Sequence, residues 1–122
     1  MKYLFLNYPK CSTCRDARKW LDANGIEYES RHIIEQNPTE EEIKKWILKN
    51  KLELKQLFNT NGQVYRKMQL RNRLSTISEA EQVKLLASDG RLVKRPLLIS
   101  EEEGILIGFN PDVWKEALKN KK

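Results

Sequence analysis

The first third of the chain constrains the fold most, because three different patterns follow one another there. Residues 2–8 (KYLFLNY) form an apolar, aromatic-rich run that ends at Pro9, which predicts a buried strand. Residues 12–23 place apolar side chains at helical spacing, and Asn24–Gly25 provides the stop signal. Residues 26–34 alternate loosely and predict a second strand. Together they predict a βαβ unit.

The middle of the chain predicts a group of helices. Thr39 and Glu42 have the spacing of a capping box at the start of a helix, and Ser78 and Glu81 repeat that pattern further on. One or two short helices are expected between them. We therefore predict a mostly helical segment over about residues 37–90.

Strand patterns return near the C-terminal end. Residues 95–100 (RPLLIS) and 104–109 (GILIGF) predict two strands joined by a tight hairpin turn. A last helix is expected to start with Asn110 as its cap and Pro111 at its first position. The order of elements is βαβ, a helical segment, then ββα. This predicts an α/β fold with a thioredoxin-like core and a helical insertion.

A chain of 122 residues has the length of one compact domain. We expect a single thioredoxin-like domain over residues 1–122, with a core made of 1–36 and 91–122. The helical insertion is expected at about 37–90. The net charge of +6 is dispersed along the chain, without an arginine-rich tract or a recognisable nucleic-acid motif. Direct nucleic-acid binding is therefore not expected.

The apolar run at Tyr3–Leu6 is too short for a signal peptide, and no run approaches the roughly 18 apolar residues of a membrane span. We expect a cytoplasmic protein that does not bind a membrane. No glycine-rich phosphate loop is present, so no cofactor is expected.

Cys11 and Cys14 are the only cysteines, and two residues separate them. A structural zinc site needs about four ligands, and His32 is the only further soft ligand in the chain. No metal is therefore expected. The two cysteines could still be an inert buried pair, which stays an alternative to a reactive one. In a reducing cytosol, a Cys-x-x-Cys between a first strand and a first helix favours redox chemistry.

The start of the predicted helix should make the two thiols unequal. Cys11 lies where the first N–H groups of a helix have no partner and where the helix dipole is positive. Lys10 and Arg15 add positive charge nearby, so we expect a lowered pKa for Cys11. Cys14 lies one turn further in and less exposed. Cys11 is therefore predicted to be the nucleophile and Cys14 the resolving thiol.

Arg95 and Pro96 form the second candidate feature. A proline is tolerated at the start of a strand, so Pro96 can simply mark a strand entry. The alternative is a cis-proline facing the two cysteines, as in thioredoxin-like folds. In that case Arg95 would hold an anion beside Cys11, whereas the alternative for this arginine is an ordinary solvated charge.

The chain resembles the arsenate reductase-like family of the thioredoxin-like superfamily, which includes glutaredoxin-linked arsenate reductases and Spx-type redox regulators. The resemblance rests, in chain order, on YPKCSTCRDARKWL, NPTEEEI, FNTNGQVYRKM, LVKRPLLI and IGFNPDVW. It implies that Cys11 is the catalytic cysteine and that Arg15 is the arginine four positions later. It also implies that Arg95 belongs to the oxyanion-binding "RP" motif.

Two features separate the chain from the arsenate enzymes. Their two other anion-binding arginines align with Asn59 and Asn110, which cannot form the bidentate clamp of a guanidinium. The second cysteine, Cys14, is similar to the Spx type.

Two functions therefore stay open. One is an arsenate or disulfide reductase that takes electrons from thioredoxin or from glutaredoxin and glutathione. The other is an Spx-like, redox-switched transcriptional regulator that binds the α-subunit of RNA polymerase.

Overall fold

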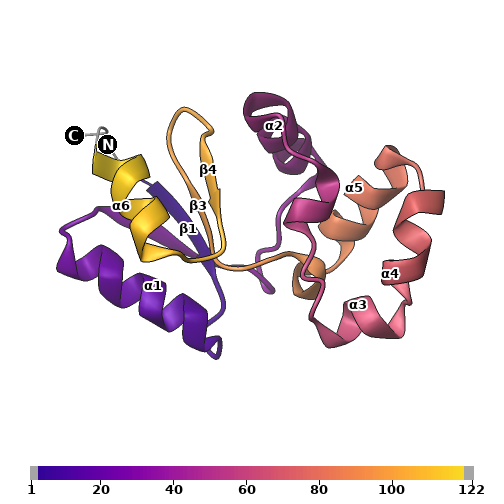
Figure 1. Cartoon of the computed structure of the whole chain (residues 1–122), viewed down its shortest axis with the longest axis horizontal. Helices are drawn as coiled ribbons and strands as arrows, with labels where there is room; N and C mark the ends of the chain where they lie inside the picture. The colour runs from indigo at the N-terminus through magenta and orange to yellow at the C-terminus, as the bar shows by residue number, and fades with distance from the viewer. Residues whose placement is uncertain (1–2, 120–122) are drawn as a thin grey trace. The chain divides into compact units, whose positions relative to one another are not determined.

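The computed structural model describes residues 3–119, and the chain divides into two compact units. The first unit combines the N-terminal segment up to His32 with the C-terminal segment from Arg95 onward. The second unit is Ile33–Lys94. Figure 1 labels the elements of both. Among the described residues, no helix is both long and apolar enough to cross a membrane.

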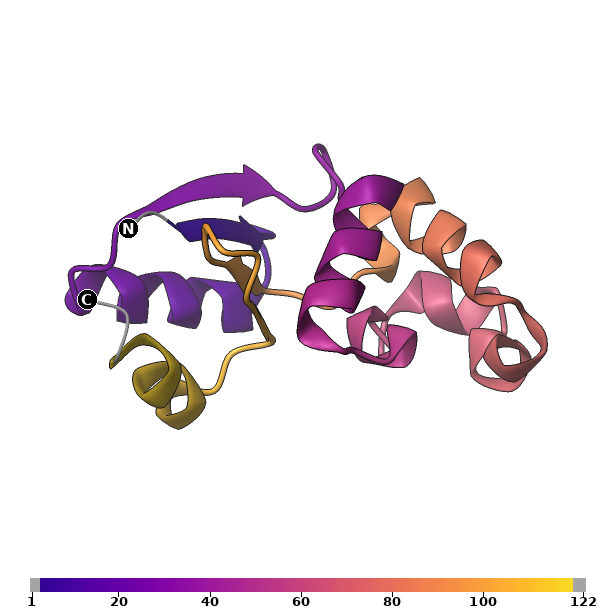
Figure 2. The same ribbon diagram turned by 90° about the horizontal axis from the view of Figure 1, so that it is seen from above.

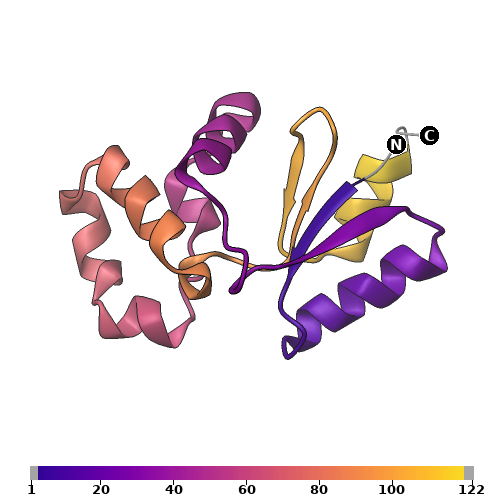
Figure 3. The same ribbon diagram turned by 180° about the vertical axis from the view of Figure 1, so that it is seen from behind.

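The first unit contains a four-stranded sheet in the order β2-β1-β3-β4. Strand β1 (Tyr3–Asn7) pairs in parallel with β2 (Tyr28–His32). Its other edge pairs antiparallel with β3 (Leu97–Ile99), which in turn pairs antiparallel with β4 (Ile105–Ile107). Figure 3 shows β2 beside β1. The predicted βαβ and ββα order is therefore confirmed.

Two helices, α1 (Ser12–Ala23) and α6 (Pro111–Lys119), lie on the same face of this sheet (Figure 2). Their buried side chains meet those of β1 and β3 in one apolar cluster. Trp20 is only partly buried and packs against this cluster. The members of the cluster are Tyr3, Phe5, Ala17, Leu21, Leu98, Trp114 and Leu118.

The predicted limits of α1 agree with the structure, whereas those of the second strand do not. Gly25 adopts the left-handed conformation (φ +65°), which glycine reaches at lower cost than a residue with a side chain, and this ends α1. β2 ends at His32, opposite Asn7. Ile34, which the sequence placed in this strand, therefore lies outside it. The reason is that β1 has already ended before Pro9, and β2 has no partner beyond that point.

The second unit is helical, as expected for the insertion. Thr39 and Glu42 form the complete capping box of α2, and Ser78 accepts a hydrogen bond from the Glu81 N–H at the start of α5. Short helical turns connect these two helices. The elements are α2 (Glu40–Asn50), η1 (Leu54–Leu57), α3 (Gln63–Lys67), α4 (Leu70–Arg73), η2 (Leu74–Thr76), α5 (Glu79–Ser88) and η3 (Gly90–Leu92).

Candidate active site

The turn between β1 and α1 positions the first cysteine. Cys11 is the N-cap of α1, with an extended backbone (φ −86°, ψ 119°). Its Sγ accepts a hydrogen bond from the Cys14 N–H at 3.4 Å, and its own N–H donates to the Tyr8 carbonyl at 3.0 Å. The thiol therefore takes the role that a serine or aspartate oxygen usually has at a helix start. This is the location predicted from the sequence.

The two cysteines differ in exposure. Cys11 is partly exposed, whereas Cys14 is 1% exposed and belongs to the buried face of α1. Both are free thiols in this structure. A reagent or substrate in solution can therefore reach Cys11 but not Cys14.

Hydrogen bonds lower the pKa of Cys11. Its partial burial acts in the opposite direction and would raise the pKa. That effect is outweighed by hydrogen bonds from the backbone and side chain of Cys14, together with a hydrogen bond and the positive charge of Arg95. The net result is a thiol that ionises more easily than an ordinary cysteine.

Burial raises the pKa of Cys14 to about 12. A hydrogen bond with the Cys11 side chain and the charge on Cys11 add to this effect. A hydrogen bond with the Tyr8 backbone and the charge of Arg95 oppose it but do not cancel it. The pKa values of two thiols one helical turn apart are thus shifted in opposite directions from that of an ordinary cysteine.

Arg95 and Pro96 immediately precede β3. The peptide bond between them is cis, so the cis alternative raised by the sequence is the one found. Pro96 is buried and its carbonyl accepts a hydrogen bond from the Gly108 N–H at 2.8 Å, whereas Arg95 is partly exposed. The first unit therefore brings Arg95 to Cys11, although 84 positions separate them in the sequence.

The other two predicted cations have a different setting. Lys10 and Arg15 flank the cysteine turn, and both side chains are exposed. The cation whose hydrogen bond and charge act on Cys11 is Arg95. Lys10 and Arg15 stay predicted contacts for an anionic substrate. Within residues 3–119, no cluster of three or more metal-binding side chains is found.

Sequence reasoning did not identify Tyr8 as part of the site. The guanidinium of Arg95 lies over its ring, 4.9 Å from the centroid. The ring also forms a T-shaped contact with His32, with centroids 5.6 Å apart. An aromatic residue directly before Pro9 and Lys10 was a weak signal, because its partner Arg95 comes from the far end of the chain.

The two asparagines that align with arginines of the arsenate enzymes have structural roles. Asn110 caps α6, because its Oδ1 accepts hydrogen bonds from the N–H groups of Asp112 and Val113 at 3.0 and 3.3 Å. In the second unit, Asn59 donates its backbone N–H to Leu92 at 2.7 Å and its side-chain amide to the Arg91 carbonyl at 3.4 Å. Both side chains are thus used in hydrogen bonds to the backbone.

Residues 6–117 match the ArsC family. The chain belongs to the ArsC family. Its relatives include the "Uncharacterized protein YusI" of Bacillus subtilis (strain 168), 47% identical over 116 residues, which covers 95% of this chain and 98% of YusI. The "Regulatory protein MgsR" of the same strain is 32% identical over 118 residues, covering 96% and 90%. The "Global transcriptional regulator Spx" of Enterococcus faecalis is 27% identical over 110 residues, covering 90% and 81%.

Solved structures agree with this ArsC assignment. A Bacteroides fragilis protein described as "ArsC family related" superimposes with a TM-score of 0.89 at 51% identity, over 95% of this chain and 97% of that one. A protein of Streptococcus mutans UA159 described as a "possible arsenate reductase" gives 0.83 at 44% identity, over 88% and 91%. The predicted family, and the α/β thioredoxin-like fold with its helical insertion, are confirmed.

Proposed function

We propose that this ArsC-family chain is a thiol–disulfide redox protein in which Cys11 is the nucleophile and Cys14 the resolving thiol. The observation that supports this most directly is the contrast between the two thiols. Cys11 is reachable, caps α1 and has a lowered pKa, whereas Cys14 is buried and has a raised pKa. A thiolate attacks disulfides and a thiol does not, so the order of attack follows from this contrast.

The first step forms a mixed disulfide. The Cys11 thiolate attacks one sulfur of a substrate disulfide, and the other half leaves as a thiolate that takes up a proton from solvent. Arg95 stabilises the negative charge on Cys11 before the attack. In the mixed disulfide Cys11 no longer has a charge, so its contribution to the raised pKa of Cys14 disappears.

The second step releases the product. Cys14 loses its proton and attacks the Cys11 sulfur, which forms the Cys11–Cys14 bond and expels the second substrate thiolate. The substrate has then gained two electrons and the protein has lost two. A cellular dithiol such as thioredoxin, or glutathione with glutaredoxin, would return them.

We favour a disulfide over arsenate as substrate. The site provides the guanidinium of Arg95, but Asn59 and Asn110 donate or accept hydrogen bonds at the backbone instead of supplying further guanidiniums. A planar guanidinium binds an oxyanion through two parallel hydrogen bonds, which an amide cannot reproduce. Arsenate nevertheless belongs in the test, because a 44% identical structure is described as a possible arsenate reductase.

A turnover assay tests the proposal. Purified protein is supplied with a thioredoxin or a glutaredoxin recycling system, and hydroxyethyl disulfide and arsenate are offered separately. We expect disulfide turnover that is abolished in Cys11→Ser, while Cys14→Ser accumulates a mixed disulfide detectable by mass spectrometry. Undiminished turnover in Cys11→Ser would disprove the assigned roles. Arsenate turnover lost in Cys11→Ser would instead contradict our preference for a disulfide.

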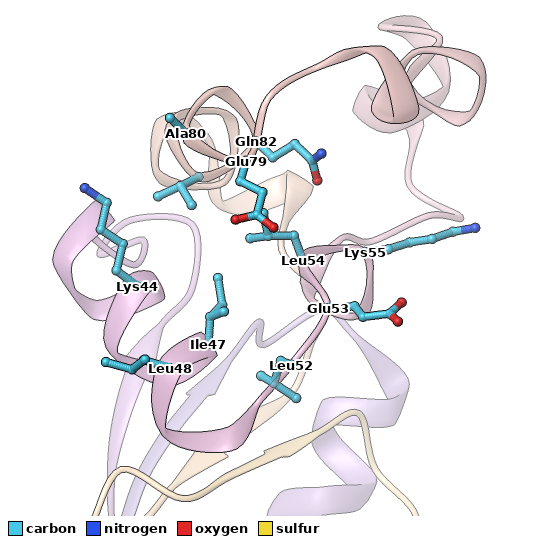
Figure 4. Close-up of a pocket in the computed structure, with 11 residues that line it drawn as sticks. Lys44, Ile47, Leu48, Leu52, Glu53, Leu54, Lys55, Glu79, Ala80 and Gln82 are labelled. Carbon is cyan, nitrogen blue, oxygen red and sulfur yellow. The ribbon is translucent and has the colours of Figure 1, made fainter.

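A second candidate function is a redox-switched transcriptional regulator that binds the α-subunit of RNA polymerase. It is favoured by the similarity to MgsR and Spx, which are named as regulators. An apolar pocket of about 710 Å³ in the second unit, lined by residues of α2, η1 and α5, would offer a protein partner a surface to bind. Figure 4 shows Ile47 and Leu54 facing this space while the amines of Lys44 and Lys55 point away from it. Leu48 of α2, which also lines this pocket, is 83% exposed.

The same purified protein separates the two functions. Immobilised in its reduced and its oxidised form, it is incubated with a cell lysate, and retained RNA polymerase α-subunit is detected by immunoblot. Retention in one redox state, together with no turnover of either substrate, would favour the regulator. Turnover without retention in either state would favour the enzyme.

A further inference from the structure

Tyr8 contacts both halves of the candidate site. Its carbonyl accepts the Cys11 N–H, and its backbone also hydrogen-bonds with Cys14, so the main chain of Tyr8 belongs to the cysteine turn. Its side chain is half-buried and turns toward the guanidinium of Arg95, which lies 4.9 Å from the ring centroid. One residue thus connects the turn before α1 to the cation that precedes β3.

Arg95 needs such a contact to act on Cys11. An arginine side chain is long and has many rotamers, and holding it in one of them has an entropic cost. Within residues 3–119, the structure shows no ion pair between Arg95 and a carboxylate. The electron-rich face of an aromatic ring attracts a guanidinium and favours the rotamers that lie over it. Tyr8 presents such a face three residues before Cys11.

We propose that Tyr8 is a positioning residue whose ring holds the guanidinium of Arg95 beside the Cys11 sulfur. This inference rests on the proposed role of Cys11 as the nucleophile. The contact uses the ring face and not the phenol hydroxyl, so phenylalanine should serve equally well. Loss of the ring should let Arg95 leave the sulfur for solvent, which lowers the fraction of Cys11 present as thiolate.

Other charged groups surround the same atoms and have to be kept constant in a test. Cys14 lies against Cys11 on α1, Lys10 and Arg15 flank it in the sequence, and His32 packs on the Tyr8 ring from β2. None of these is substituted in the variants below.

The test is the pH dependence of iodoacetamide alkylation of Cys11 in the reduced protein, with the modified residue located by mass spectrometry. The variants are Tyr8→Leu, Tyr8→Phe, Arg95→Gln and the double variant Tyr8→Leu/Arg95→Gln. In Tyr8→Leu we expect the midpoint of the profile to rise by about half a pH unit, equivalent to about threefold slower alkylation below the midpoint. Tyr8→Phe should match the wild type. The double variant should match Arg95→Gln.

Two controls make the result decisive. Tyr28→Leu removes a different tyrosine ring of the first unit, one on β2 that packs edge-on against Phe5, and should leave the profile unchanged. Circular dichroism checks that each variant is folded. If Tyr8→Leu shifts the midpoint equally with and without Arg95, or does not shift it at all, the positioning role is overturned. Because alkylation needs no substrate, this outcome is distinct from a failed turnover assay, which bears on the proposed function.

Discussion

At the scale of single residues, the position of a thiol on α1 decides its chemistry. Cys11 exchanges water for hydrogen bonds that favour the thiolate, whereas Cys14 exchanges water mainly for apolar neighbours. Three positions along one helix separate these environments. The contrast also makes the stability of the folded chain depend on pH in opposite directions through the two thiols.

Cys14 predicts a stability loss at high pH. Its pKa is raised in the folded state, to about 12, so its stabilising effect is complete below the pKa of an unfolded cysteine, about 8.5, and is lost as the pH rises toward 12. From pH 8.5 to pH 10 this effect is on the order of 1 to 2 kcal/mol. Cys11, with a lowered pKa, contributes in the opposite direction, since its stabilising effect is lost as the pH falls through its folded-state pKa.

Urea unfolding of the reduced protein between about pH 8 and 10 measures this effect. We expect the free energy of unfolding to fall less steeply with pH in Cys14→Ala than in the wild type. Tyr3, whose pKa is raised by burial, is unchanged in both and serves as the common background. Parallel pH profiles for the two proteins would mean that Cys14 ionises in the folded state as it does in the unfolded chain.

At the scale of elements, most boundaries could be predicted because their signals are local. The start and end of α1 depend on Cys11 and on Asn24–Gly25, and the start of α2 depends on Thr39 and Glu42, all within a few residues of the helices they limit. The end of β2 could not be predicted in this way. It depends on where β1 ends, more than twenty residues earlier in the sequence.

The same distinction applies to the site. The inequality of the two cysteines follows from a local pattern, and it was predictable. The contacts of Arg95 with Tyr8 and Cys11 depend on how β3 pairs with β1, for which a single sequence gives no register. The cis bond before Pro96 was one of two alternatives that the sequence left open.

The start of α6 gives a prediction about Asn110, which aligns with an anion-binding arginine of the arsenate enzymes. Asn110→Arg restores the residue type of the arsenate enzymes but removes the oxygen that accepts the N–H groups of Asp112 and Val113. Loss of such a cap costs about 1 kcal/mol. We expect a corresponding decrease in the free energy of urea unfolding, and the same decrease for Asn110→Ala.

Asn110→Asp is the matched control, because a carboxylate can accept both hydrogen bonds and also suits the positive end of the helix dipole. It should be as stable as the wild type. Equal stability of Asn110→Arg and the wild type would show that the cap contributes nothing to α6.

At the scale of the whole molecule, the second unit closes on itself by a backbone contact between its two ends. A β-carbon at Gly90 would lie only 2.0 Å from the Ile33 carbonyl oxygen. Both residues are buried, and Ile33 is 0% exposed. Only glycine therefore allows the end of the α5 region to approach the segment that leaves β2.

Gly90→Ala should therefore destabilise the second unit by roughly 3 kcal/mol or more, because the obstacle is backbone and cannot rotate away. Gly25→Ala is the control: its β-carbon would meet nothing within 4 Å, and the expected cost is about 1 kcal/mol for the left-handed conformation. Hydrogen exchange read by mass spectrometry should show that Gly90→Ala accelerates exchange, relative to the wild type, more in residues 33–94 than in residues 3–32. Equal increases in both segments would mean that the units unfold together.

The division of the chain has a consequence for how such a protein can change over generations. Every contact described for Cys11 comes from the segments before Ile33 and after Lys94. Mutations between those two positions leave these described contacts of Cys11 in place. Evolutionary change in the middle segment can therefore alter the surface that binds other proteins, while Cys11 keeps the contacts that lower its pKa.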